Sequence, residues 1–131
     1  MGKGFHSRDF CPDRLTVRER LCSQHAGVGA NMAIRRDWLA ARGGFDTALD
    51  VGTPAHGGGD LDMFHRTLAA GGTLRYQPSA IVHHYHRREM RALRRQLYDN
   101  GRAFGVYLIS RVRCGERGEA VIAYAAGCGG W

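Results

Sequence analysis

The stretch that decides the fold is residues 57–66, which read Gly-Gly-Gly-Asp-Leu-Asp-Met-Phe-His-Arg. Three glycines lead into two acids, Asp60 and Asp62, and acids are favoured at the positive end of a helix. Apolar residues then recur three and four positions apart, on one helical face, at Leu61, Phe64 and Leu68. The sequence therefore predicts a helix from Leu61 that ends at Gly71-Gly72, with a carboxylate at its loop junction.

Asp60 is the candidate catalytic residue. The plain interpretation is that both acids only cap the helix, an effect worth about 0.3–1 kcal/mol. A cap does not require three flexible glycines, whereas a loop that meets a substrate can use them. We therefore predict that Asp60 is a general base that deprotonates a hydroxyl nucleophile. Asp62 is expected to bind substrate or to hold Asp60 in place.

The segment upstream combines glycines with a small-to-apolar run, Gly27 to Ile34. This pattern predicts a strand with close backbone approach. Asn31 lies within it and offers a donor and an acceptor suited to a sugar or an amide. Asp37 then predicts the cap of a short helix, Trp38–Ala41, which stops at Gly43-Gly44.

The segment downstream predicts two strands, Thr73–Tyr76 and Ala80–Tyr85, and the second ends among histidines. Side chains alternate along a strand, so His84 and His86 share a face and His83 takes the other. Imidazoles bind Mn, Zn and related ions and also contact phosphate oxygens. Hydrogen-bonded surface histidines are the alternative interpretation.

A long basic helix is expected over residues 88–110. Met90, Leu93 and Leu97 fall on one face and arginines surround them, while two glycines, Gly101 and Gly105, are expected to weaken or kink it. The basic face is either solvated or contacts phosphates or lipid headgroups. Aromatics are not interleaved with the arginines and no nucleic-acid-binding signature is present, which argues against a nucleic-acid partner.

Composition places the chain among globular proteins of one small domain, with 131 residues and a formal charge of +7 that attracts polyanions. Its four cysteines lack Cys-x-x-Cys spacing, which predicts reduced thiols. No apolar run is long enough to span a bilayer. We therefore expect a cytoplasmic protein, with peripheral attachment to the inner membrane face as an open option.

Several short motifs in this order resemble the second half of family 2 glycosyltransferases, over about three fifths of the chain, from Gly27 to Leu108. The motifs are Gly29-Ala30-Asn31-Met32-Ala33-Ile34-Arg35-Arg36, Gly43-Gly44-Phe45-Asp46, Gly59-Asp60-Leu61-Asp62-Met63 with Arg66, Ala70-Gly71, Tyr76-Gln77-Pro78 and Val82-His83-His84-Tyr85-His86. Each motif is short, and the specificity comes from their order and spacing.

The resemblance implies a GT-A-type α/β fold that transfers a sugar from a nucleotide-sugar donor to an acceptor hydroxyl with inversion. It implies that Asp60 is the base. His84, and secondarily His86, would help to hold a divalent metal, Mn or Mg, or the diphosphate. The remaining candidate substrate-binding residues are Asn31, Gly58, Gly59, Asp62 and Arg66. The family's Glu before the catalytic Asp is replaced here by Gly59, so the acceptor contacts of that Glu are absent.

A second departure concerns the nucleotide-binding half of the family's domain, which has no counterpart before Gly27. The only Asp-x-Asp is Asp60-Leu61-Asp62, at the acceptor-side position. We therefore expect a partial GT-A-like α/β domain with a short mixed sheet, flanking helices and a final long basic helix. Its expected parts are an irregular segment (residues 1–26), the glycosyltransferase part (27–110) and a partly disordered tail (111–131).

Such a fragment is expected to be inactive alone, with the missing half supplied by a longer protein or a partner chain. Two other functions remain open. The first is a non-catalytic basic module that binds an anionic membrane surface or a partner chain. The second is a small metal-binding protein with histidine ligands.

Overall fold

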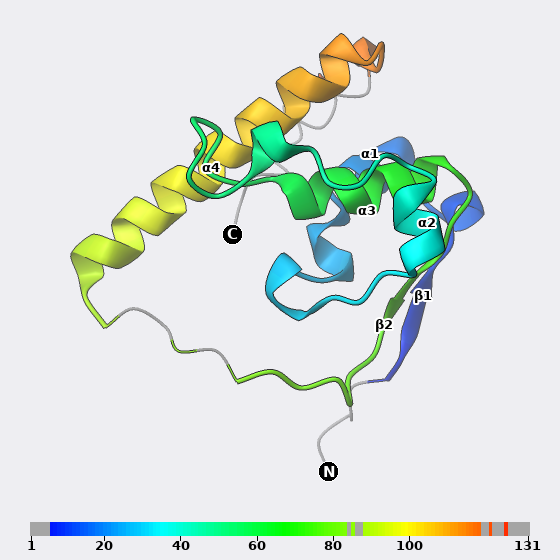
Figure 1. The fold of residues 1–131 in the computed structure, drawn as a ribbon, viewed down its shortest axis with the longest axis horizontal. Coiled ribbons are helices and arrows are strands. Elements are labelled where there is room, and N and C mark those ends of the chain that lie inside the picture. The colour runs from blue at the N-terminus through cyan, green and yellow to red at the C-terminus, as the bar shows by residue number, and fades with distance from the viewer. Residues whose placement is uncertain (1–5, 84, 86–87, 119–120, 122–124, 126–131) are drawn as a thin grey trace.

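The computed structural model describes residues 6–83, 85, 88–118, 121 and 125 (Figure 1). The elements follow in the order β1 (Arg8–Phe10), α1 (Val17–Leu21), α2 (Arg36–Ala40), α3 (Gly59–Ala69), β2 (Leu74–Tyr76) and α4 (Met90–Arg113). Short 3-10 turns lie at Pro12–Arg14, Ser23–Ala26, Gly29–Asn31 and Thr47–Leu49. Figure 1 shows α4 as a long rod whose first half stands clear of the other elements.

The helix α3 confirms the prediction made from its apolar spacing and flanking glycines. Gly58 precedes it in a left-handed conformation, with φ 103°. At the other end Gly71 has φ 80°, and the Gly72 N–H donates to the Thr67 carbonyl at 2.9 Å. Glycine reaches these backbone angles without strain, which is why the glycines mark both ends.

The helix α2 begins two residues earlier than predicted and also ends at the glycine pair. Gly43 and Gly44 have φ 75° and 76°, and the Gly44 N–H donates to the Leu39 carbonyl. Asp37 is not the N-cap residue. It lies in the first turn and forms an ion pair with Arg35.

Residues 6–26 are more ordered than the irregular segment we expected. Thr16 caps α1 with a capping box, in which the Thr16 hydroxyl and the Glu19 carboxylate each accept a backbone N–H. Leu21 at the end of α1 is fully buried. The weak periodicity of the segment concealed these elements because each is only three to five residues long.

The sheet is antiparallel and contains two strands, β1 and β2, with Asp9 opposite Arg75. The Arg75 guanidinium donates to both carboxylate oxygens of Asp9, at 2.7 and 2.8 Å. Two expectations are wrong for the residues that the structure describes: the sheet is antiparallel and not mixed, and residues 27–34 form a 3-10 turn with irregular flanks. Residues 80–83 and 85 are not strand either. A strand needs a neighbouring strand to pair with its backbone groups, and within the described residues no strand pairs with these segments.

The core lies where the second half of α4 packs on α1 and α3. Its buried members are Leu21, Cys22, Leu61, Phe104, Tyr107 and Leu108. The Tyr107 hydroxyl donates to the Leu21 carbonyl at 3.3 Å, and burial raises the pKa of that phenol. The helix is continuous through Gly101 and Gly105, so the predicted weakening does not interrupt it.

Cysteine chemistry differs in part from the prediction. Cys11 and Cys114 are free, as expected. Cys22 is buried and disulfide-bonded, so the prediction of a reduced thiol is wrong at this position. Among the described residues, no helix combines the length and the apolar character needed to cross a membrane.

Candidate functional site

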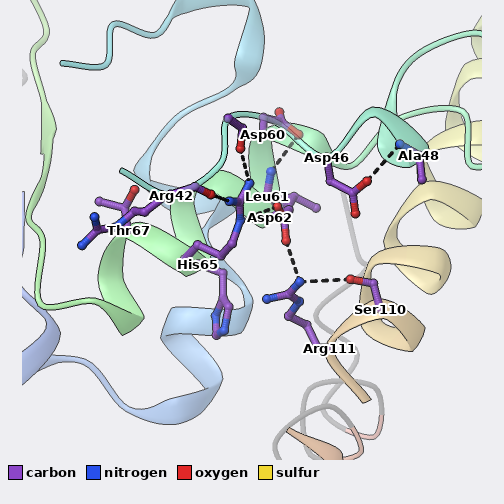
Figure 2. A network of polar contacts seen from close by, with 12 residues as sticks. Arg42, Asp46, Ala48, Asp60, Leu61, Asp62, His65, Thr67, Ser110 and Arg111 are labelled. Carbon is purple, nitrogen blue, oxygen red and sulfur yellow. Dashed lines mark hydrogen bonds and ion pairs between the residues drawn. The ribbon is translucent and has the colours of Figure 1, made fainter. Parts of the chain in front are cut away.

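Asp60 lies at the first turn of α3 and is partly exposed (Figure 2). Its Oδ1 accepts the N–H of the next residue, Leu61, at 2.9 Å. Its Oδ2 accepts the backbone N–H of Gly29, which lies outside α3, also at 2.9 Å. Two fixed donors from separate segments therefore set the orientation of this carboxylate.

Gly29 favours that close approach because it has no Cβ. A Cβ placed on Gly29 would lie 3.1 Å from both Cβ and Oδ2 of Asp60, which is tighter than ordinary packing. Gly29 is not among the site residues predicted from the sequence. The available signal was its place in Gly27-Val28-Gly29, directly before Asn31.

The glycine loop, residues 57–59, packs on α4. Gly57 and Gly58 have φ 137° and 103°, and a Cβ on Gly58 would lie 3.3 Å from the Ala103 carbonyl oxygen. Gly59 has no positive φ, and a Cβ placed on it would lie 3.5 Å from the Leu49 carbonyl oxygen. This packing fixes the position of Asp60 relative to α4. The substrate contacts predicted for Gly58 and Gly59 remain predictions.

Asp62 is buried, with 1% of its surface exposed, between two arginines. The Arg66 Nε lies 2.7 Å from its Oδ2, and a terminal guanidinium nitrogen of Arg111 lies 2.8 Å from its Oδ1 (Figure 2). Arg66 also donates to the Arg42 and Gly44 carbonyls at 2.7 Å each. Asp62 and its two arginines thus join α3, α4 and the loop after α2. The role expected of Asp62, to bind substrate or to hold Asp60 in place, remains a prediction.

A second buried contact reinforces the junction of α3 with the end of α4. His65 Nε2 lies 2.8 Å from Oε2 of Glu116, and the imidazole is 2% exposed. Arg111 also approaches Glu116, at 4.0 Å. Arg111 and Glu116 were not predicted from the sequence, because they lie about 50 residues after α3 and meet it only when the chain folds.

Asn31 lies at the edge of a hollow of about 530 Å³. Its Nδ2 donates to the Ala80 carbonyl at 2.7 Å. The hollow is mainly apolar, and its lining includes Ile34, Trp38, Phe64 and Leu74. Its size is that of a small-molecule pocket. Asp60 lies beside the hollow rather than in its lining, one turn of α3 before Phe64.

The predicted metal ligands are the part of the site that lies outside the described residues. Within the described residues, no three or more His, Cys, Asp or Glu side chains gather to hold an ion, so these residues alone do not assemble a metal centre. His84 and His86 lie outside the described residues, and His83 is exposed. The Mn or Mg ion with these two histidines remains a prediction.

Comparison with known proteins gives one similarity. The chain is 39% identical over 81 residues to the pre-mycofactocin glycosyltransferase of Mycobacterium tuberculosis, in the strains CDC 1551 / Oshkosh and H37Rv. The similarity covers 59% of this chain, and the chain spans 16% of the length of those relatives. No family model and no solved structure matches. The chain is therefore similar to part of a glycosyltransferase.

Proposed function

We propose that this chain is the acceptor-side part of a family 2-type, inverting glycosyltransferase of the GT-A class and that Asp60 is its general base. The observation that carries the proposal is the Asp60 carboxylate, held by the Gly29 and Leu61 N–H groups beside the hollow that Phe64 lines. The 39% identity to part of a glycosyltransferase supports it independently.

In the proposed reaction the acceptor hydroxyl lies against Asp60. Its oxygen attacks the anomeric carbon of the donor while the proton passes to the Asp60 carboxylate. The bond from that carbon to the nucleoside diphosphate oxygen breaks, and the diphosphate leaves with the bonding electrons. Each Asp60 oxygen accepts one N–H bond and so retains a lone pair for the incoming hydroxyl.

Other predicted residues receive roles from their contacts. The Nδ2 of Asn31 already donates to Ala80, so its carbonyl oxygen is the group we assign to an acceptor hydroxyl. The guanidinium of Arg66 is occupied by Asp62, Arg42 and Gly44, which suits a positioning residue. We place the donor site, and the divalent ion that goes with it, in a longer protein or a partner chain.

The proposal is tested by exchange of the matched segment. The corresponding segment of the mycobacterial glycosyltransferase is replaced by this one, and nucleoside diphosphate release is measured with and without acceptor. We expect the chimera to transfer sugar and its Asp60→Asn variant to lose about 10²–10⁴-fold in rate. Asp50→Asn, an exposed acid of the same charge, is the matched control and is expected to be neutral.

Two results would overturn the proposal. One is full turnover by the Asp60→Asn chimera, because it would show that Asp60 is not the base. The other is a folded chimera that binds the donor but transfers nothing. For the isolated chain we expect little or no transfer, and any donor hydrolysis that it shows should disappear in Asp60→Asn.

A further inference from the structure

The helix α4 carries one apolar stripe along its whole length, and only half of that stripe is covered. Phe104 and Leu108 lie on it and are buried in the core. Met90, Leu93 and Leu97 continue it at helical spacing and are 63%, 42% and 48% exposed. Figure 1 shows this first half of α4, residues 90–98, standing away from the other elements. We call it the free half of α4.

Exposed apolar residues continue into the segment that precedes the helix. Ile81, Val82 and Tyr85 are 72%, 53% and 96% exposed, and Tyr98 follows within the free half. Seven of the large exposed hydrophobic residues thus lie between residues 81 and 98. Scattered exposed apolar side chains are ordinary, whereas a concentration in one segment marks an interaction surface.

Arginines surround the stripe. Residues 88–102 contain two acids and five arginines, which are Arg88, Arg91, Arg94, Arg95 and Arg102. All five are exposed. In the part of the chain that the structure describes, Arg95 approaches Asp99 at 3.9 Å, and no ion pair is found for Arg91 or Arg94. The free half is therefore both apolar on one side and positively charged on the other.

We propose that the free half of α4, with Ile81, Val82 and Tyr85, docks this chain on an anionic lipid bilayer. The apolar side chains enter the boundary between headgroups and acyl chains, and the arginines contact lipid phosphates. A helix with one apolar stripe and a basic polar face suits that interface, whereas single-stranded nucleic acid favours aromatic side chains between the arginines. The proposal is independent of catalysis and stands if the glycosyltransferase assignment fails.

The test is cosedimentation of the whole chain with vesicles at low salt. We expect binding to phosphatidylcholine vesicles that contain phosphatidylglycerol, weaker binding at high salt, and little binding to phosphatidylcholine alone. Each arginine near an anionic surface contributes about 1 kcal/mol, so Arg91→Gln/Arg94→Gln/Arg95→Gln should weaken binding about 100-fold. Leu93→Ser/Leu97→Ser should weaken it as well, because both side chains are expected to enter the bilayer.

The matched control is Arg14→Gln/Arg36→Gln/Arg117→Gln, which removes the same charge from exposed positions outside α4 and should retain most of the binding. Hydrogen exchange gives a second measurement: vesicles should slow exchange in residues 90–98. Equal weakening by the two triple variants would overturn the proposal, because it indicates attraction to net charge alone. Unchanged binding of the leucine variant would also overturn it and would favour an acidic macromolecule as the partner.

Discussion

Gly29 donates its backbone N–H to the Asp60 carboxylate at 2.9 Å, across 31 residues of sequence. The contact joins the 3-10 turn Gly29–Asn31 to the start of α3. A Cβ on residue 29 would lie 3.1 Å from Asp60 Oδ2, so a glycine at this position favours the contact. The orientation of the proposed base therefore depends on a residue that bears no functional group.

Gly29→Ala is expected to displace Asp60 while the chain stays folded. The added Cβ would lie 3.1 Å from Asp60 Oδ2, so the carboxylate must move by a few tenths of an ångström or more. A hydrogen bond to a charged group contributes about 1.5–3 kcal/mol, and its loss should speed hydrogen exchange of the residue 29 amide. Native-state exchange by NMR measures this directly.

Gly118→Ala is the control for that experiment, because its added Cβ would meet nothing within 4 Å. It should leave the exchange of residue 29 unchanged. Unaltered protection of the residue 29 amide in Gly29→Ala would show that the hydrogen bond to Asp60 does not hold this segment.

Arg111→Met is expected to destabilise the fold strongly. The substitution removes one of the two cations beside Asp62, whose carboxylate is 1% exposed. Removal of one partner of a buried ion pair typically costs about 3–5 kcal/mol. Urea unfolding followed by circular dichroism should show a lower midpoint at an unchanged slope.

The exposed neighbour Arg113 provides the comparison. Arg113→Met changes the same charge and side-chain type on the same helix and should stay within about 0.5 kcal/mol of the parent chain. Equal effects of the two substitutions would show that net charge, and not the contact with Asp62, determines stability.

Two glycine substitutions should have opposite effects on stability. Gly58→Ala places a Cβ at φ 103° and 3.3 Å from the Ala103 carbonyl oxygen, and the backbone angle alone costs about 1–2 kcal/mol. Gly101→Ala lies inside α4, where its Cβ meets nothing within 4 Å, and should stabilise by about 0.5–1 kcal/mol. Thermal unfolding of both variants measures the two effects.

A rise in melting temperature for Gly58→Ala would contradict the packing of the glycine loop on α4. A fall for Gly101→Ala would mean that α4 is not helical around residue 101 in solution. The two outcomes can be separated because Gly58 packs on α4, whereas a Cβ on Gly101 meets nothing within 4 Å.

The pairing of β1 with β2 should weaken in acid. The hydrogen bond from the Arg75 side chain holds the pKa of Asp9 below its usual range. Because the folded pKa is the lower one, the contact stabilises the fold above the unfolded carboxyl value of about 3.9. That contribution is lost as the pH falls through the folded pKa.

An NMR titration of the Asp9 carboxyl carbon tests this prediction. In Arg75→Gln the midpoint should rise towards the ordinary carboxyl value, and amide exchange in β1 should become less dependent on pH. The same midpoint in both proteins would rule out the Arg75 contact as the cause.

The sequence alone predicted the helices best. Glycines and apolar spacing located α3, and apolar spacing also gave most of α4. These elements satisfy their backbone groups within a single segment, so local pattern is sufficient. Asp60 at the loop–helix junction was likewise evident from the order of glycines and acids.

The tertiary structure decided what depends on partners distant in sequence. The strand predicted within residues 27–34 did not form, because no neighbouring strand pairs with it in the described residues, whereas β2 formed against β1. The Gly29 donor to Asp60 and the Arg111 pair with Asp62 join residues 31 and 49 positions apart. A helix forms its backbone hydrogen bonds within one segment, so local sequence can predict it, whereas a strand or a buried charge meets its partner only when the chain folds.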